Sequence, residues 1–227
     1  MKQPQEETSE HAMNHHPSAE NAATSDAIFP ATSMPDADWW RALWPDPDAV
    51  VRALGIAAGM RVLDLACGDG YFTAALARCV GSGQVLGLDL DARLLAAAQA
   101  ACAGLPCRWH LADAMAIDRL GLGSFDVVLM ANTFHGVPDK ETLARVVAAV
   151  LTPTGRFAIV NWHPAPREQT PVLGQPRGPR TDLRLSPEAT AKIVRPAGLE
   201  PDRLIPLPPY HYGLLLRKPS ARDPRAE

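Results

Sequence analysis

The residues best suited to chemistry in this chain are carboxylates and glycines placed where apolar segments end. The run VLDLACGDGYFT, residues 62–73, carries Asp64 in its apolar part and Gly68 and Gly70 in its turn-forming part. Glycine has no Cβ, so the backbone can turn sharply there and a ligand can lie against its N–H groups. The run therefore predicts a strand, a tight glycine turn and a helix, whose N-terminus suits a nucleotide-type ligand.

Two further acids follow the next two apolar segments. Asp89 lies about twenty residues after Gly68, the spacing at which a carboxylate binds the hydroxyls of a ribose. Asp113 follows the segment 107–111, which is a predicted third strand. Three successive strands are thus predicted to end near an acid.

With these motifs in order, residues 54–160 resemble the S-adenosylmethionine-dependent methyltransferases of class I, particularly the small-molecule branch called methyltransferase type 11. The resemblance extends more loosely to the C-terminus. It implies an α/β, Rossmann-like fold with a seven-stranded mixed sheet in the order 3-2-1-4-5-7-6 and helices on both faces. It also implies S-adenosyl-L-methionine as the cofactor and no metal.

The resemblance assigns the first-strand acid and the glycine turn to the methionine end of the cofactor, Asp89 to the ribose and Asp113 to the adenine amino group. The full expected set of cofactor contacts is Asp64, Cys67, Gly68, Gly70, Asp89, Leu90, Asp113, Ala114 and Asn132. Thr73 replaces the third glycine of a dinucleotide fingerprint. Because Asp64 would repel a pyrophosphate and suits the methionine ammonium, both residues favour S-adenosylmethionine over NAD.

Methyl transfer from a sulfonium requires the protein to position the acceptor, exclude water and, for a protonated acceptor, remove a proton. Three histidines fall where a base could act: His135 after the fourth predicted strand, His163 after the fifth, and His211 near the final hairpin. An imidazole titrates near neutral pH and can accept such a proton. A purely structural role is the alternative for each.

The chain divides into a polar tail, residues 1–26, predicted to be disordered, and a single domain over residues 27–227. The segment 27–58, with Trp39, Trp40 and Trp44, either forms a helical lid over the pocket or packs on the sheet. A loop of about twenty residues from 164 to 185 either forms part of the substrate wall or is a surface excursion. From residue 166 onward eleven Lys and Arg face seven acids, which could favour an anionic substrate group.

The net charge, the apolar runs and the cysteines of the chain limit the classes of partner that it could bind. A net charge of −3 argues against nucleic acid, and no apolar run approaches a membrane span or a signal peptide. Four cysteines without a CxxC pair favour free thiols and a cytoplasmic protein. We expect a monomer or homodimer that methylates a small molecule. The alternatives are a non-catalytic S-adenosylmethionine-binding regulatory or scaffold protein, and a methyltransferase acting on RNA or protein.

Overall fold

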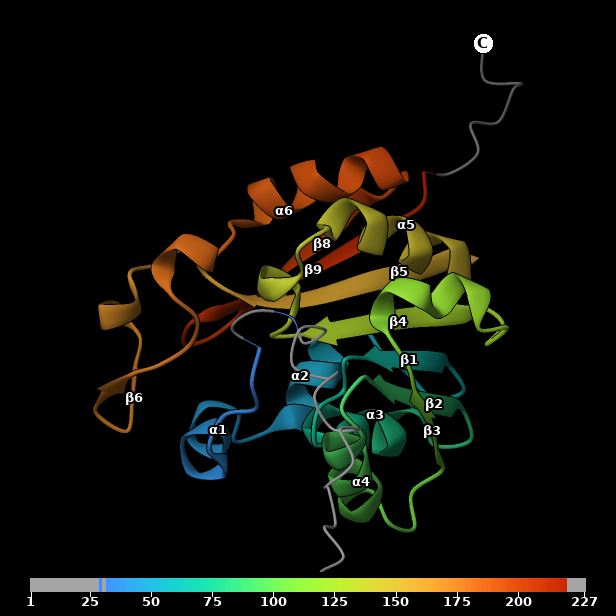
Figure 1. The fold of residues 1–227 in the computed structure, drawn as a ribbon, viewed down its shortest axis with the longest axis horizontal. Helices are drawn as coiled ribbons and strands as arrows, with labels where there is room; N and C mark the ends of the chain where they lie inside the picture. Colours follow the sequence, from blue (N-terminus) through green and yellow to red (C-terminus); the bar gives the residue numbers. More distant parts are fainter. Residues whose placement is uncertain (1–28, 30–31, 220–227) are drawn as a thin grey trace, which may run out of the picture.

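The computed structural model describes residue 29 and residues 32–219, so the tail predicted for residues 1–26 lies outside the described residues. A seven-stranded sheet in the order β3-β2-β1-β4-β5-β9-β8 forms the centre of the molecule (Figure 1). Its strands are β1 (Arg61–Leu65), β2 (Gln84–Asp89), β3 (Cys107–Leu111), β4 (Phe125–Ala131), β5 (Leu151–Trp162), β8 (Glu200–Leu207) and β9 (His211–Arg217). β1 to β5 are parallel, and β9 runs antiparallel to both β5 and β8. The predicted mixed sheet is confirmed, and its last two strands are numbered differently because a short hairpin precedes them.

Helices cover both faces of the sheet, as predicted. They are α1 (Ala37–Leu43), α2 (Pro47–Ala53), α3 (Tyr71–Val80), α4 (Ala92–Ala101), α5 (Lys140–Val150) and α6 (Pro187–Val194). Figure 1 shows α5 and α6 on one side and α1 to α4 on the other. The uninterrupted apolar strand β4 serves both layers: Val128 and Met130 pack in the cluster with α5, while Val127 and Leu129 pack in the cluster with α3.

Local sequence signals fix several helix starts. The Asp46 carboxylate accepts a hydrogen bond from the Ala49 N–H at 2.8 Å, and Pro47 follows as the first helical residue of α2. The Asp91 side chain caps α4 and the Ser186 hydroxyl caps α6 in the same way. Aspartate and serine are among the residue types favoured at helix N-caps.

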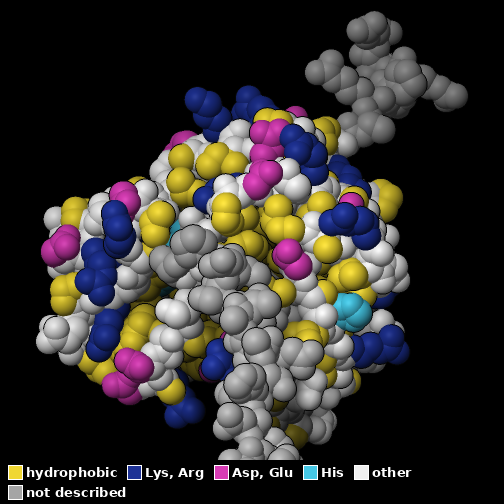
Figure 2. Space-filling model, viewed as in Figure 1, with side chains coloured by type: hydrophobic (Ala, Val, Ile, Leu, Met, Phe, Trp, Pro, Cys, Tyr) yellow, Lys and Arg dark blue, Asp and Glu magenta, His cyan; other side chains and the backbone are white. Residues whose placement is uncertain are grey.

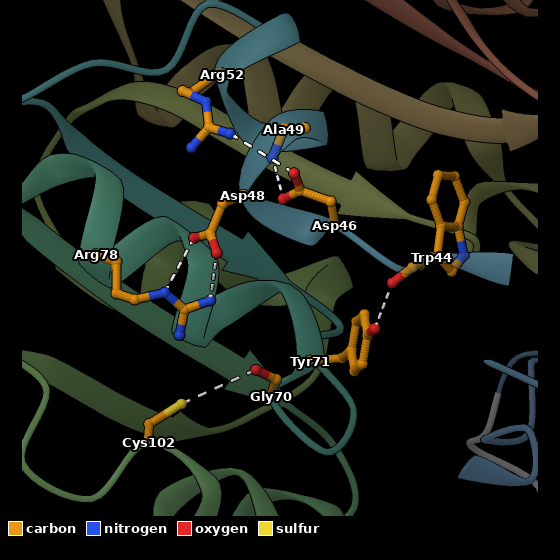
Figure 3. A network of polar contacts seen from close by, with 9 residues as sticks. All are labelled: Trp44, Asp46, Asp48, Ala49, Arg52, Gly70, Tyr71, Arg78 and Cys102. Atoms are coloured by element: carbon orange, nitrogen blue, oxygen red, sulfur yellow. Dashed lines mark hydrogen bonds and ion pairs between the residues drawn. The ribbon is translucent and has the colours of Figure 1, made fainter. Parts of the chain in front are cut away.

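Two polar contacts attach α3 to the segment before the sheet (Figure 3). The Arg78 guanidinium donates to both oxygens of Asp48 at 3.0 and 2.9 Å, which joins α3 to α2. The Tyr71 hydroxyl donates to the Trp44 carbonyl at 2.5 Å, and the Trp44 indole packs edge-on against Phe72. α3 is therefore attached at both ends, by Tyr71 in its first turn and by Arg78 in its last turn, and the Tyr71 contact steadies the glycine turn that leads into the helix.

β5 contains a bulge near its start. The strand begins at Leu151 and includes residues 152–155. Phe125 pairs with Leu151 and Val127 pairs with Arg156, so the intervening residues of β5 bulge out of the ladder. A Cβ on Gly155 would lie 2.7 Å from the Phe125 carbonyl oxygen, so the bulge requires glycine there.

The segment between β5 and α6 contains a hairpin of two very short strands, β6 (Pro171–Val172) and β7 (Gln175–Pro176), that the sequence did not predict. Short 3-10 turns flank it at Arg167–Gln169 and Thr181–Leu183. This segment projects from the carboxyl end of β5, at the same end of the sheet as the glycine turn (Figure 1). It therefore reaches the part of the molecule where ligands bind in open α/β sheets.

Candidate active site

The glycine turn between β1 and α3 is joined to the end of β2 by one carboxylate. Asp89 is 8% exposed, and its two oxygens accept hydrogen bonds from the Gly68 N–H at 2.8 Å and the Asp91 N–H at 2.9 Å. Gly68 has φ +57°, a conformation that glycine adopts without steric cost. Asp89 thus holds the turn in place and keeps its own carboxylate in a fixed orientation.

The two glycines of the turn allow different parts of the chain to approach it closely. A Cβ on Gly68 would lie 2.5 Å from the Met34 sulfur, so this glycine allows the segment before α1 to lie over the turn. A Cβ on Gly70, at φ +84°, would lie 2.9 Å from the Cβ of Ala98 in α4. Gly70 therefore permits close packing of α4 under the turn.

Asp64 is the most deeply buried acid of the site. It is 2% exposed and accepts a hydrogen bond from the Thr73 hydroxyl at 2.5 Å. Burial raises the pKa of Asp64 to about 7, against the lowering effect of the Thr73 hydrogen bond and with a smaller contribution from Asp89. A cation bound beside this carboxyl group would favour its charged form.

A cavity of about 760 Å³ runs across the carboxyl ends of the parallel strands. Its wall includes eight of the nine predicted cofactor residues: Asp64, Cys67, Gly68, Asp89, Leu90, Asp113, Ala114 and Asn132. Gly70 is not part of that wall. Small-molecule pockets are typically about 300 to 1,000 Å³, so this volume suits a nucleoside-sized ligand together with a small second molecule.

Asn132 has the strained geometry expected of a functional position. It follows β4 directly, at φ +58°, and its backbone N–H donates to the Val160 carbonyl at 2.8 Å. Both polar atoms of its side chain are buried without a hydrogen-bond partner within residue 29 and residues 32–219. A buried amide in this state lacks the partners that a bound polar ligand would supply.

The three candidate histidines do not lie together at the cavity. His135, 4% exposed, is in the wall. His163 is half-buried beside the Tyr212 ring, and His211 is 1% exposed with its ring centroid 4.4 Å from that of Trp44 and 4.1 Å from that of Trp162. Burial holds the pKa of His211 well below its usual value, and neighbouring His163 and Arg184 act in the same direction. Because neither His163 nor His211 lines the cavity, only His135 of the three lies where a base could contact a bound acceptor.

The opposite wall comes from α1, whose tryptophans were candidates for a lid, and from the end of β5 and the segment after it. Trp39 and Trp40 of α1 and Trp162 at the end of β5 contribute aromatic surface. The segment between β5 and α6 contributes Arg167, Arg177 and Arg180. The sequence offered three signals for this wall: the tryptophan segment, the length of the loop and the excess of basic residues after residue 166. None of them indicates which arginines face inward.

The fold and this geometry agree with known proteins. Residues 62–155 match a family model described as a methyltransferase domain. These residues form a methyltransferase domain. The fold of the chain matches that of a solved S-adenosylmethionine-dependent methyltransferase from Aquifex aeolicus, with a TM-score of 0.67 and 24% identity over 80% of this chain and 93% of that one.

Two curated relatives share the methyltransferase domain. An uncharacterized methyltransferase of Mycobacterium tuberculosis is 35% identical over 51% of this chain and 57% of its own length. A 2-phytyl-1,4-naphtoquinone methyltransferase of Synechococcus elongatus is 34% identical over 59% of this chain and 58% of its own length. The matches thus span a little over half the length of these relatives.

Within the described part of the chain, no helix is long and apolar enough to cross a membrane. The same residues include no group of three or more His, Cys, Asp or Glu side chains arranged to hold a metal ion.

Proposed function

We propose that this protein transfers a methyl group from S-adenosylmethionine to a small organic molecule. The observation that carries the proposal is the meeting of Asp64, Gly68 and Asp89 on the wall of one cavity at the carboxyl ends of β1 and β2. A buried carboxyl group, a backbone that a ligand can approach closely and an oriented carboxylate are what a cationic nucleoside requires.

The residues fit the cofactor as follows. Asp89, held by Gly68 and Asp91, would accept hydrogen bonds from both ribose hydroxyls. Asp113 accepts from the Met115 N–H through one oxygen at 2.8 Å, which leaves its other oxygen for the adenine amino group. Asp64 and the Gly68 turn would hold the methionine end, whose ammonium favours the ionised form of Asp64.

The cofactor, when bound, supplies a methyl group on a good leaving group. The chain's own contribution is to position the acceptor, exclude water and hold the proton that leaves it. Trp39 and Trp40, 8% and 7% exposed, cover the cavity from the α1 side. His135 lines the cavity from the turn after β4 and is the candidate base for a hydroxyl or thiol acceptor.

A small-molecule acceptor is supported by the aromatic wall and by the naphthoquinone methyltransferase among the relatives. We further propose that the protein acts in the cytoplasm and binds neither nucleic acid nor membrane, consistent with its net charge of −3. Residues 27–58 were expected to form a lid. In this proposal only residues 32–36 and α1 cover the cavity, whereas α2 packs against α3.

The first test is isothermal titration of S-adenosylhomocysteine into the wild type and the Asp89→Asn variant. Charge-assisted hydrogen bonds contribute about 1.5 to 3 kcal/mol each, so we expect binding to weaken by about 10- to 100-fold in the variant. Asp118→Asn, on the exposed surface of a 3-10 helix outside the cavity wall, is the matched control and should bind normally. No binding by the wild type, or equal binding by Asp89→Asn, would contradict the cofactor assignment.

A second test separates catalysis from binding alone. Transfer of labelled methyl groups is measured on a panel of hydroxylated aromatic and quinol compounds, with S-adenosylhomocysteine affinity measured in parallel. His135→Asn should lower kcat while cofactor affinity stays unchanged. Tight cofactor binding without turnover on any acceptor would favour the alternative of a non-catalytic binding protein, and salt-sensitive RNA binding would favour a methyltransferase acting on RNA.

A further inference from the structure

The segment between β5 and α6 is folded around one buried cation, Arg184. This residue is 6% exposed, and its guanidinium lies 4.9 Å from the Trp162 ring centroid. It donates hydrogen bonds to neutral oxygens only: the carbonyls of Pro179, Ala165 and Arg177 at 3.1, 2.9 and 3.0 Å, and the Thr170 hydroxyl at 3.0 Å. The segment is thus held in one shape, and the positive charge at its centre is not neutralised by any of these contacts.

The same segment lies flat against Trp162. Gly178 has φ +85°, and a Cβ there would lie 2.7 Å from the indole ring. Its carbonyl accepts a hydrogen bond from the Arg167 Nε at 3.0 Å. The backbone on either side of Gly178 is therefore fixed relative to the cavity, and so is the origin of the neighbouring Arg177 side chain.

Arg177 extends from this fixed backbone along the cavity wall. Its guanidinium lies 5.2 Å from the Trp39 ring centroid, and its Nε is buried without a hydrogen-bond partner. It forms no ion pair with any carboxylate of the described chain. An arginine that lies against an indole and has an unused buried donor can bind an acceptor group from a ligand.

The three cofactor-side acids and two arginines lie on different sides of the cavity, whose wall also includes Asp36 and the Arg93–Asp91 ion pair. Asp64, Asp89 and Asp113 lie on the side formed by β1, β2 and β3. Arg167 and Arg177 lie on the side of the segment after β5, and neither is neutralised by a described carboxylate, whereas Arg180 pairs with Asp182. Figure 2 shows basic side chains gathered at the left of the view, over the part of the chain that carries β6 in Figure 1. This half of the cavity attracts anions.

We infer that Arg177 binds a carboxylate on the methyl acceptor, and that the acceptor is a small aromatic acid whose flat body lies against the aromatic wall of the cavity. The inference rests on the proposed function, because it assigns the substrate half of the same cavity. A guanidinium matches a carboxylate through two parallel N–H donors. The indoles provide apolar surface for an aromatic body.

The test compares 2-naphthoate with 2-naphthamide, which have the same shape and differ in charge. Each probe is titrated calorimetrically into the full-length protein, with and without saturating S-adenosylhomocysteine. In the wild type the acid should bind at least about tenfold more tightly than the amide, and this preference should weaken as salt rises. Arg177→Gln should remove the preference, Arg177→Lys should retain part of it, and both should bind S-adenosylhomocysteine as the wild type does.

Arg195→Gln is the control, because Arg195 is exposed in the turn after α6 and is not part of the cavity wall. It should keep the full preference. Equal binding of acid and amide by the wild type, binding of neither, or an undiminished preference in Arg177→Gln would overturn the inference. If S-adenosylhomocysteine does not bind, the cofactor assignment fails, and the preference measured without it still decides the role of Arg177.

Discussion

The Thr73 hydroxyl, on the first turn of α3, donates a hydrogen bond to the Asp64 carboxyl group of β1 across 2.5 Å. Both residues are almost wholly buried, at 0% and 2% exposed. The contact links the strand before the glycine turn to the helix after it, and it provides a hydroxyl partner for a carboxyl group removed from water. The ends of the turn are thus fixed by one buried pair.

Replacing Thr73 by valine should therefore destabilise the fold. The substitution conserves shape but leaves a buried carboxyl group without its hydroxyl partner, which costs about 1 to 3 kcal/mol in the free energy of unfolding. Urea denaturation at pH 6 measures the change. Thr154→Val, at an exposed position in the β5 bulge, should have a much smaller effect. Equal stabilities of Thr73→Val and the wild type would contradict this role.

The raised pKa of Asp64 makes stability depend on pH. The folded protein holds this proton up to a pKa of about 7, whereas an unfolded aspartate loses it near 3.8. Between these values the unfolded state binds fewer protons, so the free energy of unfolding falls as pH rises from about 4 to about 7, by on the order of 4 kcal/mol. Urea unfolding at several pH values should show this decline in the wild type. In Asp64→Asn the decline should be smaller, and identical pH profiles would contradict the assignment.

Alanine substitutions at two glycines with nearly the same backbone conformation distinguish the cost of steric contact from the cost of backbone strain. Gly70 and Gly104 have φ of +84° and +82°, but a Cβ meets Ala98 at 2.9 Å in the first case and nothing within 4 Å in the second. Gly104→Ala should cost about 1 to 2 kcal/mol for the left-handed conformation alone. Gly70→Ala should cost about 1 to 3 kcal/mol more because α4 must move. Thermal or urea unfolding of the two variants measures the difference, which would vanish if Gly70 only served a ligand.

Two glycine variants test whether contact with Trp162 holds the segment after β5 in place. Gly178→Ala forces a methyl group against Trp162, whereas Gly174→Ala, at φ +75°, meets open space. We expect Gly178→Ala to lift the segment from the indole, which should increase its cleavage by protease and weaken 2-naphthoate binding about tenfold or more. Gly174→Ala should be cleaved and bind like the wild type. Similar behaviour of the two variants would show that contact with Trp162 does not hold the segment.

Sequence reasoning succeeded where short-range signals decide the structure. The bounds of α3 follow from the apolar periodicity of residues 71–80, and the starts of α2, α4 and α6 follow from Asp46, Asp91 and Ser186. The acids after β1, β2 and β3 meet at one cavity because parallel strands end at the same edge of a sheet.

Sequence reasoning failed where a residue distant in the chain determines the local structure. The turn motif predicts a ligand contact for Gly70, which stays a prediction, but it does not reveal that Ala98 of a later helix packs against this glycine. The hairpin of β6 and β7 is held by Arg184, which follows it in the chain. No local pattern reveals such a partner, and for the same reason the inward position of Arg177 could not be predicted.

The hydrogen bonds of Arg184 allow the cavity wall between β5 and α6 to change in sequence while it keeps its shape. Three of its four acceptors are main-chain carbonyl oxygens, which every amino acid provides. The side chains at positions 165 and 177 can therefore be exchanged without dismantling the framework that presents them. One arginine anchors the frame while the surface facing the ligand stays free to diverge, so related proteins could acquire new substrates by altering position 177 and keeping position 184.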